Sequence, residues 1–340
     1  MSRTGAAALI LVLAGSVHAQ PAAPRPLDIR FIDVEGGQAT LFVAPSGESM
    51  LIDTGFPGND GRDLNRILAA IQDAGLNTLD YLVITHYHSD HVGNAATIAA
   101  KIPVGTFVDH GPLRERTTEL DALYEEYVKA RAGGRHIEAK PGDKIPIRDL
   151  DVTIVASDGR LLARPLPRAG EPNPLCENFK MHDPDRTENA YSLGAVIVSG
   201  RFRMLDLGDL NWNNEYMLAC PNDLIGPIDL YLTTHHGLFQ SGADVLVHAV
   251  KPRVAIMNNG ATKGGSASAM RIVRSSPGLL DFWQIHYAVD SDANMPPAMI
   301  ANLDESSAYG ISVQAQRDGS FTVTNERTHE TRKYSPRLRN

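Results

Sequence analysis

The chain has 340 residues, of which 43% are hydrophobic and 21% are charged. It is therefore long and apolar enough to bury a full core, and this composition argues against intrinsic disorder. The net charge of -8 argues against a general binder of nucleic acid or of anionic membranes, because such proteins carry basic clusters. The composition thus contains no strong nucleic-acid-binding signature.

The first residues predict a secretory signal peptide over residues 1–19. Arg3 supplies a positive charge, residues 5–15 are almost wholly apolar, and small residues lead to an expected cleavage site after Ala19. A membrane anchor is the alternative, but this apolar run is well short of the roughly 20 residues that span a bilayer. Prolines and alanines then predict a linker over residues 20–26.

We expect residues 27–340 to form one folded domain in the compartment to which the chain is exported, periplasmic or secreted. No later segment is apolar for long enough to cross a membrane, so no transmembrane partner is implied. Cys176 and Cys220 would lie where a disulfide persists, although the sequence leaves their pairing open. Their isolation argues against a zinc ribbon, which uses closely spaced cysteine pairs.

Short apolar strands and amphipathic helices alternate along this domain, which predicts the α/β class. Strands are predicted at 27–34, 39–44, 50–53, 80–85, 105–108, 191–199, 202–207, 228–233, 254–257 and 282–286, with a final pair within 309–323. Helices are predicted at 61–74, 93–100, 119–130, 213–219 and 245–250. Residues 157–187 lack periodicity and are predicted to form a loop that covers or rims the functional site.

The segment His86-Tyr87-His88-Ser89-Asp90-His91 holds three imidazoles and one carboxylate in six residues, directly after a predicted buried strand. Imidazole nitrogen and carboxylate oxygen are suitable ligands for zinc and related metals, and a rigid strand end can aim them. The alternative is a solvated histidine-rich turn, but this density of ligand side chains is hard to explain by packing. The segment therefore predicts a metal site.

This segment resembles the HxHxDH signature of the metallo-β-lactamase superfamily. Three further segments resemble conserved parts of that family in the same order: residues 51–55, 207–210 and 234–237. The resemblance implies a four-layer αβ/βα sandwich, a hydrolase domain over residues 27–340 and a site for two divalent metal ions. It covers the chain from about Leu27 to the region of His286.

The resemblance also implies a role for individual residues. His86 and His88 would bind one metal, Asp90, His91 and His235 would bind the other, and Asp209 would bridge the two. Asp90 and Asp209 would be the catalytic carboxylates, and Asp53 would support the ligands. His236 is the weaker ligand candidate, because a role in supporting ligands or in facing the substrate is at least as consistent with its position.

One segment departs from the family pattern. Family members usually carry a further histidine before the strand that leads to the bridging aspartate, and here Asn189, or less plausibly Glu188, stands at that position. The nearest spare histidines, His110 and His182, fit surface or substrate-pocket positions better than ligand positions. The first metal would then be held more weakly, or its coordination completed by solvent.

Two cations about 3.5 to 4 Å apart can lower the pKa of a bridging water and polarise the bond under attack. Asp90 would orient the resulting hydroxide. We favour zinc because mixed imidazole and carboxylate ligands suit it, although manganese and iron are compatible with the same set. The presence of Asp209 argues against a dedicated β-lactamase, and that of His88 argues against the di-iron redox relatives. Ester, lactone, thioester and phosphodiester substrates remain.

Residues 31–39, together with the segments around Asn189, Asp209 and His235, resemble the hydrolase domain of competence-type DNA-uptake proteins, which suggests phosphodiester substrates. Gln38 stands where that group usually has an aspartate, and its membrane channel is absent. The glycine-rich residues 258–265 could present Lys263 to an anionic substrate, although a solvated turn is the simpler interpretation.

His286, at the end of a predicted strand, is a further candidate to face the pocket. Three hypotheses follow from the whole sequence: an exported hydrolase acting on a small-molecule or phosphodiester substrate, a phosphodiesterase or nuclease, and a metal-binding protein without turnover. The complete ligand set favours the first and argues against the third.

Overall fold

The computed structural model describes residue 1 and residues 25–338. The predicted signal peptide and most of the predicted linker therefore lie outside the described residues. Among the helices of residues 25–338, none combines the length and apolar character that crossing a bilayer requires.

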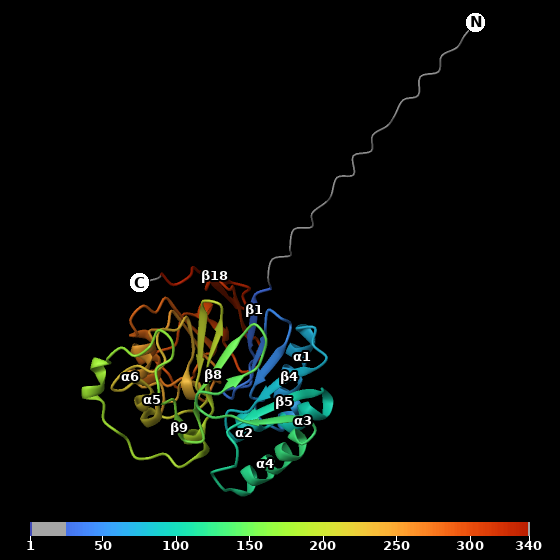
Figure 1. Cartoon of the computed structure of the whole chain (residues 1–340), viewed down its shortest axis with the longest axis horizontal. Helices are drawn as coiled ribbons and strands as arrows, with labels where there is room; N and C mark the ends of the chain where they lie inside the picture. The colour runs from blue at the N-terminus through green and yellow to red at the C-terminus, as the bar shows by residue number, and fades with distance from the viewer. Residues whose placement is uncertain (2–24, 339–340) are drawn as a thin grey trace.

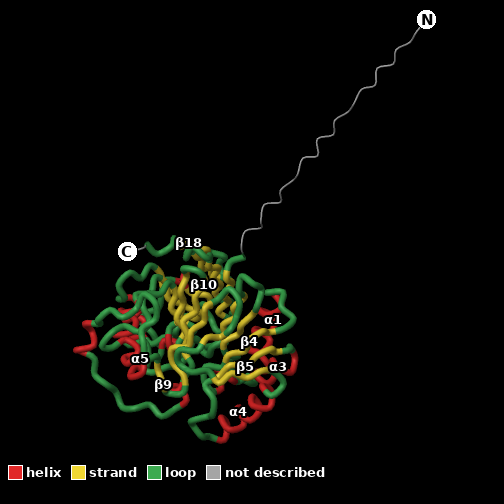
Figure 2. Tube along the Cα trace, in the orientation of Figure 1, coloured by secondary structure: helices red, strands yellow, loops and turns green. Residues whose placement is uncertain are grey.

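Two sheets of nine strands each stand side by side in the middle of the molecule, and helices flank them (Figures 1 and 2). The first sheet has the order β18 (Thr331–Tyr334), β17 (Phe321–Asn325), β16 (Ile311–Ala315), β1 (Leu27–Phe31), β2 (Thr40–Val43), β3 (Ser49–Ile52), β4 (Leu79–Val83), β5 (Val104–Asp109) and β6 (Arg135–Glu138). The second has the order β15 (Ile300–Asn302), β14 (Asp281–His286), β13 (Val254–Met257), β12 (Leu230–Leu232), β11 (Phe202–Asp206), β10 (Gly194–Ser199), β8 (Asp151–Ser157) and β7 (Lys144–Ile145), and β9 (Arg160–Leu161) pairs with β8.

Helices of the two halves of the chain lie at opposite sides of this pair of sheets (Figure 2). On one side are α1 (Arg62–Asp73), α2 (Ser89–Val92), α3 (Ala95–Lys101) and α4 (Thr118–Arg131). On the other are α5 (Trp212–Ala219), α6 (Asp244–Val250) and α7 (Ala267–Arg274). Short 3-10 turns occupy Asn59–Gly61, Pro174–Asn178, Glu188–Tyr191, Thr234–Gly237 and Pro297–Met299.

The hydrophobic core has two parts, which define the layers. In the larger part, Phe31 of the first sheet belongs to the same buried cluster as Val152 and Val196 of the second, because β1 alternates apolar inward residues with polar outward ones. In the smaller part, Ile67 of α1 and Leu82 of β4 pack together on the other face of the first sheet. The predicted α/β class and four-layer αβ/βα sandwich are thus confirmed.

The parallel strands position the functional side chains. Strands β3, β4 and β5 run parallel in the first sheet, and β11 to β14 run parallel in the second. Because parallel strands end at the same edge of a sheet, residues that follow them collect there. Asp53 and His86 follow β3 and β4, while Asp209 and His235 follow β11 and β12.

The strands and helices with strong apolar periodicity lie where the sequence predicts them, to within a few residues at their ends. The exceptions are β8, a seven-residue strand inside the second sheet, and helix α7, neither of which the sequence analysis predicts. The other missed strands are short or lie at sheet edges, among them β6, β7, β9, β15 and β18. The predicted loop over residues 157–187 contains β9 and one 3-10 turn, and a disulfide between Cys176 and Cys220 attaches it to the end of α5.

Candidate metal centre

Two histidines at the end of β4 form the first part of the site. His86 is fully buried, and its Nε2 lies 3.0 Å from Nδ1 of His88. The other ring nitrogen of His88, Nε2, lies 3.0 Å from a carboxylate oxygen of Glu115. An acceptor on one ring nitrogen fixes the orientation of an imidazole and leaves the other nitrogen free to bind a metal. Nε2 of His86 and Nδ1 of His88 therefore point to one place.

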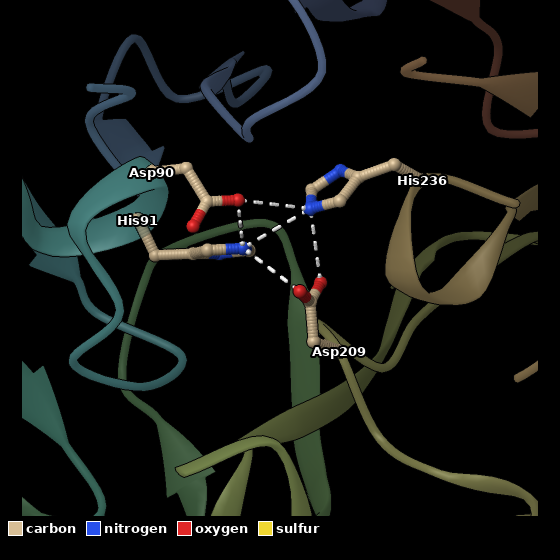
Figure 3. A group of neighbouring side chains, drawn as sticks. All are labelled: Asp90, His91, Asp209 and His236. Atoms are coloured by element: carbon tan, nitrogen blue, oxygen red, sulfur yellow. Dashed lines mark hydrogen bonds and ion pairs between the residues drawn. The ribbon is translucent and has the colours of Figure 1, made fainter. Parts of the chain in front are cut away.

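Four buried side chains form the second part: Asp90, His91, Asp209 and His236 (Figure 3). Their ligand atoms all lie within 4.8 Å of one another. Oδ2 of Asp90 is 3.2 Å from Nε2 of both His91 and His236, and these two nitrogens are 3.3 Å apart. Two carboxylates and two imidazoles thus converge on a single point.

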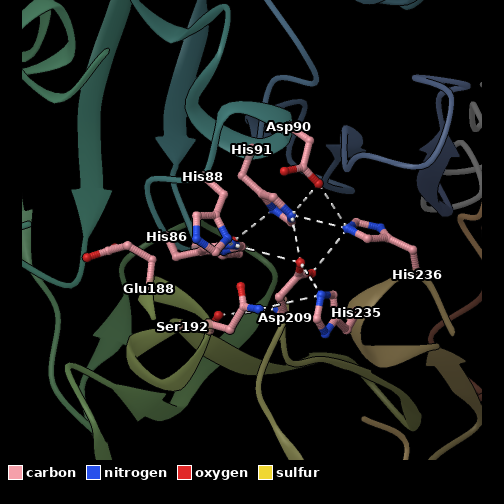
Figure 4. Close-up of polar contacts among 12 residues, drawn as sticks. His86, His88, Asp90, His91, Glu188, Ser192, Asp209, His235 and His236 are labelled. Atoms are coloured by element: carbon pink, nitrogen blue, oxygen red, sulfur yellow. Dashed lines mark hydrogen bonds and ion pairs between the residues drawn. The ribbon is translucent and has the colours of Figure 1, made fainter. Parts of the chain in front are cut away.

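Asp209, for which the sequence analysis predicts a bridging role, lies between the two parts (Figure 4). Its Oδ2 is 3.3 Å from Nε2 of His91, 3.4 Å from Nε2 of His235 and 3.9 Å from Nε2 of His86. Its Oδ1 is 3.3 Å from Nε2 of His236. No other carboxylate in the described residues is within 4.0 Å of both His86 and His236.

Asp53, which the sequence analysis predicts to support the ligands, contacts His91. Oδ2 of Asp53 lies 2.7 Å from Nδ1 of His91, and Asp53 also accepts hydrogen bonds from the backbone N–H and the hydroxyl of Thr85. This chain of contacts directs Nε2 of His91 to the point of convergence. Asp53 itself has a φ of 61°, which is uncommon for a residue with a side chain and suggests a position fixed by its surroundings.

The structure brings both His235 and His236 into the site, although in different places from the predicted ones. His236 joins Asp90 and His91, whereas the sequence interpretation placed His235 there. Both histidines have left-handed backbone conformations, with φ of 55° and 53°. Close packing of Gly264 helps to permit this turn, because a Cβ on that glycine would lie 2.2 Å from the carbonyl oxygen of His236.

Asn189 reaches the site at the position where the family usually has a histidine. Its Nδ2 lies 3.5 Å from Nε2 of His235, and its Oδ1 is buried without a hydrogen-bond partner among the described residues. Glu188 instead turns away and accepts hydrogen bonds from the backbone N–H groups of Tyr87 and Arg114. The Glu188 side chain therefore supports the loop that carries His86 and His88, and does not replace a ligand.

The remaining candidates divide between the site and its surroundings. Lys263 contacts Oδ2 of Asp90, so it lies at the edge of the site. His110 pairs with Glu188 at 3.0 Å, and His286 pairs with Asp33 at 2.8 Å. Neither His110 nor His286 has a side-chain contact with the residues that converge around Asp209. The exposed His182 lies on the loop over residues 157–187.

The buried charges favour a cation at the point of convergence. Burial opposes ionisation of Asp90 and Asp209. The imidazole of His91 nevertheless holds the pKa of Asp90 well below its usual value, and the imidazole of His236 does the same for Asp209. Burial likewise opposes charge on His91, yet Asp209 and Asp90 raise its pKa well above the usual value. Burial lowers the pKa of His86 well below its usual value, so that this imidazole is neutral.

These residues fit divalent metal ions. Carboxylates bind metals in their ionised form and imidazoles in their neutral form, so a metal ion here would replace the proton that Asp209 and Asp90 favour on His91. Buried nitrogen and oxygen ligands at this spacing suit zinc and its neighbours. We call the seven residues that converge here the candidate metal centre: His86, His88, Asp90, His91, Asp209, His235 and His236. The sequence predicts six of them as ligands and places the seventh, His236, among the supporting candidates.

The chain is similar to several known proteins. Residues 33–171 match the family model described as the metallo-beta-lactamase superfamily. Recombination protein 2 of Haemophilus influenzae is 26% identical over 67% of this chain and 24% of its own length. Ribonuclease Z of Methanopyrus kandleri is 29% identical over 39% of this chain and 47% of its own length. A metal-dependent hydrolase of Staphylococcus carnosus is 35% identical over 19% of this chain and 25% of its own length. The match thus spans from 24% to 47% of the length of these relatives.

Proposed function

Because the chain contains a metallo-β-lactamase superfamily domain and is a metal-dependent hydrolase, we propose that it hydrolyses phosphodiester bonds with two divalent metal ions, zinc being the favoured metal. One relative is named a ribonuclease and another a recombination protein, and both names concern nucleic acids. The observation that carries the proposal is the position of Lys263, whose ammonium group contacts Asp90 of the candidate metal centre.

The cavity next to Lys263 is lined by three basic side chains and two acidic ones. It has a volume of about 450 Å³, and Arg62 and Arg66 line it together with Lys263. The Lys263 ammonium also lies 4.9 Å from the centre of the Phe56 ring, which holds the side chain over the cavity. Glu35 and Glu305 offset part of this charge, and both arginines form ion pairs: Arg62 with Asp63 at 2.6 Å, and Arg66 with Asp33 at 2.8 Å and Glu35 at 3.1 Å. Lys263 is therefore the basic side chain of this cavity that lies at the metal centre. A phosphoryl oxygen would therefore meet Lys263 at the edge of the metal centre.

The residues of the candidate metal centre would have different roles in hydrolysis. His86, His88 and His235 would hold one metal ion, Asp90, His91 and His236 the other, and Asp209 both. Bound there, such ions supply activated water and electrophilic stabilisation of the phosphoryl group. Asp90 is ionised, and its carboxylate can orient the attacking water by accepting a hydrogen bond from it. Lys263 can stabilise the negative charge that develops on a phosphoryl oxygen, and removal of one such donor typically costs about 10²- to 10³-fold in rate.

Substitution of Lys263 tests the proposal. We expect Lys263→Ala to lower kcat/KM for bis-p-nitrophenyl phosphate about 10²-fold, and to lower that for a neutral p-nitrophenyl ester much less. Lys263→Arg should recover part of the loss because it keeps the charge. Lys101→Ala, at the exposed end of α3, is the matched control. Hydrolysis of lactones or thioesters by the metal-loaded protein, without hydrolysis of any phosphodiester, would refute the proposed substrate class.

We further propose that the protein acts in the periplasm or outside the cell. The bond between Cys176 and Cys220 supports this location, because disulfides persist in oxidising compartments. Fractionation of cells that express the full chain should recover it outside the cytoplasm, shortened at its N-terminus. Recovery of full-length protein with free thiols from the cytoplasm would contradict the proposal.

A further inference from the structure

A second cavity, of about 590 Å³, opens between the segments that follow two residues of the candidate metal centre. Trp212 follows Asp209 by three residues, and Phe239 follows His236 by three residues, and both line the cavity. The two segments are joined, because the backbone N–H of Trp212 donates to the carbonyl of Gln240 at 3.2 Å. Two walls of the cavity therefore come from the segments that begin at Asp209 and His236 of the metal centre.

The third wall comes from the loop that the Cys176–Cys220 disulfide attaches to α5. His182 lies on this loop, and its ring packs edge-on against Trp212 with a centroid distance of 4.2 Å. Asn213 fixes the loop, since it accepts a hydrogen bond from the His182 N–H and donates another to the His182 carbonyl, both at 2.9 Å. The contact with His182 thus fixes the position of the Trp212 ring at the wall of the cavity.

The lining of this cavity combines aromatic faces with polar edges. Trp212 is half-buried and Phe239 is 58% exposed, so that two apolar rings border the space. Polar side chains stand beside these rings, among them Asp183, Asn211 and Gln240. A planar heterocycle has the same division, with apolar faces that stack on aromatic rings and an edge that forms hydrogen bonds.

The charges of the two cavities also differ in sign. The cavity of Lys263 carries lysine and arginine side chains, whereas the larger one carries Asp183 and Asp185 and no lysine or arginine among its lining residues. A phosphate is therefore favoured in the first and disfavoured in the second. The two cavities share no lining residue, but each has a link to the metal centre: Lys263 of the first contacts Asp90, and Trp212 and Phe239 of the second follow Asp209 and His236 by three residues.

We propose that the larger cavity binds the nucleobase of a nucleotide phosphodiester whose phosphate lies at the metal centre. This inference rests on the proposed function and adds the substrate class: a nucleoside ester in place of a simple alkyl or aryl phosphodiester. Trp212 is the residue that determines the preference, because the base stacks on its ring. An alkyl or acyl chain would fill the same space but could form no hydrogen bond with the exposed side chains of Asp183 and Gln240.

Two substrates with the same leaving group test the inference: thymidine 5′-(p-nitrophenyl phosphate) and methyl p-nitrophenyl phosphate. We expect the metal-loaded protein to prefer the nucleoside ester. Trp212→Ala should raise KM for that ester about 10- to 100-fold, in line with the loss of one stacked base, and should change KM for the methyl ester less than about threefold. Trp212→Phe should restore most of the difference. Met217→Ala, an exposed position on α5 outside the cavity, is the matched control.

Fluorescence gives a readout that does not depend on turnover. The chain has two tryptophans, and Trp283 is fully buried, so a nucleotide should quench mainly Trp212. Thymidine monophosphate should quench wild-type protein in a saturable way, and ribose 5-phosphate should not.

Three results would separate the two claims. Equal preference for both esters, with phosphodiester hydrolysis intact, would overturn the nucleobase site and leave the proposed function standing. Equal losses for both esters in Trp212→Ala would overturn it too, because Trp212 would then act only on the structure. Saturable quenching by thymidine monophosphate, in protein that hydrolyses no phosphodiester, would support the nucleobase site and refute the proposed function.

Discussion

Glu215 is a fully buried carboxyl beneath the loop that follows the last histidines of the candidate metal centre. Its two oxygens accept hydrogen bonds from the backbone N–H groups of Gly242 and Ala243, at 3.0 and 2.8 Å. The same loop contains Ser241, whose hydroxyl lies 3.2 Å from Nδ1 of His235. Burial raises the pKa of Glu215 to about 7, although the two N–H groups act in the opposite direction.

This shift makes the stability of the protein depend on pH in a defined direction. The folded state holds the Glu215 proton more tightly than the unfolded chain, whose carboxyl has its usual pKa of about 4.5. The contribution of Glu215 to the free energy of unfolding is therefore complete below about pH 4.5 and is lost as the pH rises through about 7. A shift of this size corresponds to about 3 kcal/mol.

Glu215→Gln removes the titration and keeps the shape of the side chain. Urea denaturation between pH 4.5 and pH 8 should show the variant gaining about 3 kcal/mol relative to wild type as the pH rises. The amide of Glu215→Gln has one hydrogen-bond acceptor fewer at every pH, so the free energy of unfolding can differ from wild type by a constant amount. Only the change of this difference with pH tests the prediction. An excess of chelator in all samples keeps metal binding out of the comparison. Glu125→Gln, at an exposed position of α4, is the control and should follow wild type in parallel. Parallel curves for Glu215→Gln as well would refute the reasoning.

Two further predictions concern metal binding, and competition with a chromophoric chelator measures both. Asp53→Asn should weaken metal binding about 10- to 100-fold, because the carboxylate that orients His91 through Nδ1 is lost. Unchanged metal affinity would show that the backbone alone fixes the His91 ring. Asn189→His should tighten the binding of one metal ion, because it places an imidazole next to His235. If the variant releases both ions as easily as wild type does, the position that we assign to Asn189 is wrong.

Local sequence patterns account for the parts of the fold that the sequence predicts. Apolar residues such as Ile67 and Ile71 recur at helical spacing because one face of α1 is buried against the first sheet. Four of the metal-centre residues, His86 to His91, lie within six positions, so their proximity follows from the chain itself. Asp209 and His235 are found because each follows a short apolar strand in a segment that resembles a known family.

The roles that depend on distant contacts are not visible in the sequence. His236 enters the centre because two successive residues adopt left-handed conformations, and the packing of Gly264 against the His236 carbonyl makes room for that turn. Glu188 supports Tyr87, which is 101 residues earlier in the chain, and no local pattern distinguishes such a carboxylate from a ligand. The aromatic cavity beside Trp212 likewise requires three separate segments to meet.

The distribution of ligands between the two sheets has a consequence for folding. His86, His88, Asp90 and His91 follow a strand of the first sheet, whereas Asp209, His235 and His236 follow strands of the second. Asp90 comes from the first group and Asp209 from the second, yet both contact Nε2 of His91 (Figure 4). The full ligand set therefore exists only when the two sheets pack against each other through their shared core. A metal that binds only the packed state stabilises it by mass action. Loss of metal should therefore weaken the contact between the sheets as well as the chemistry at their common edge.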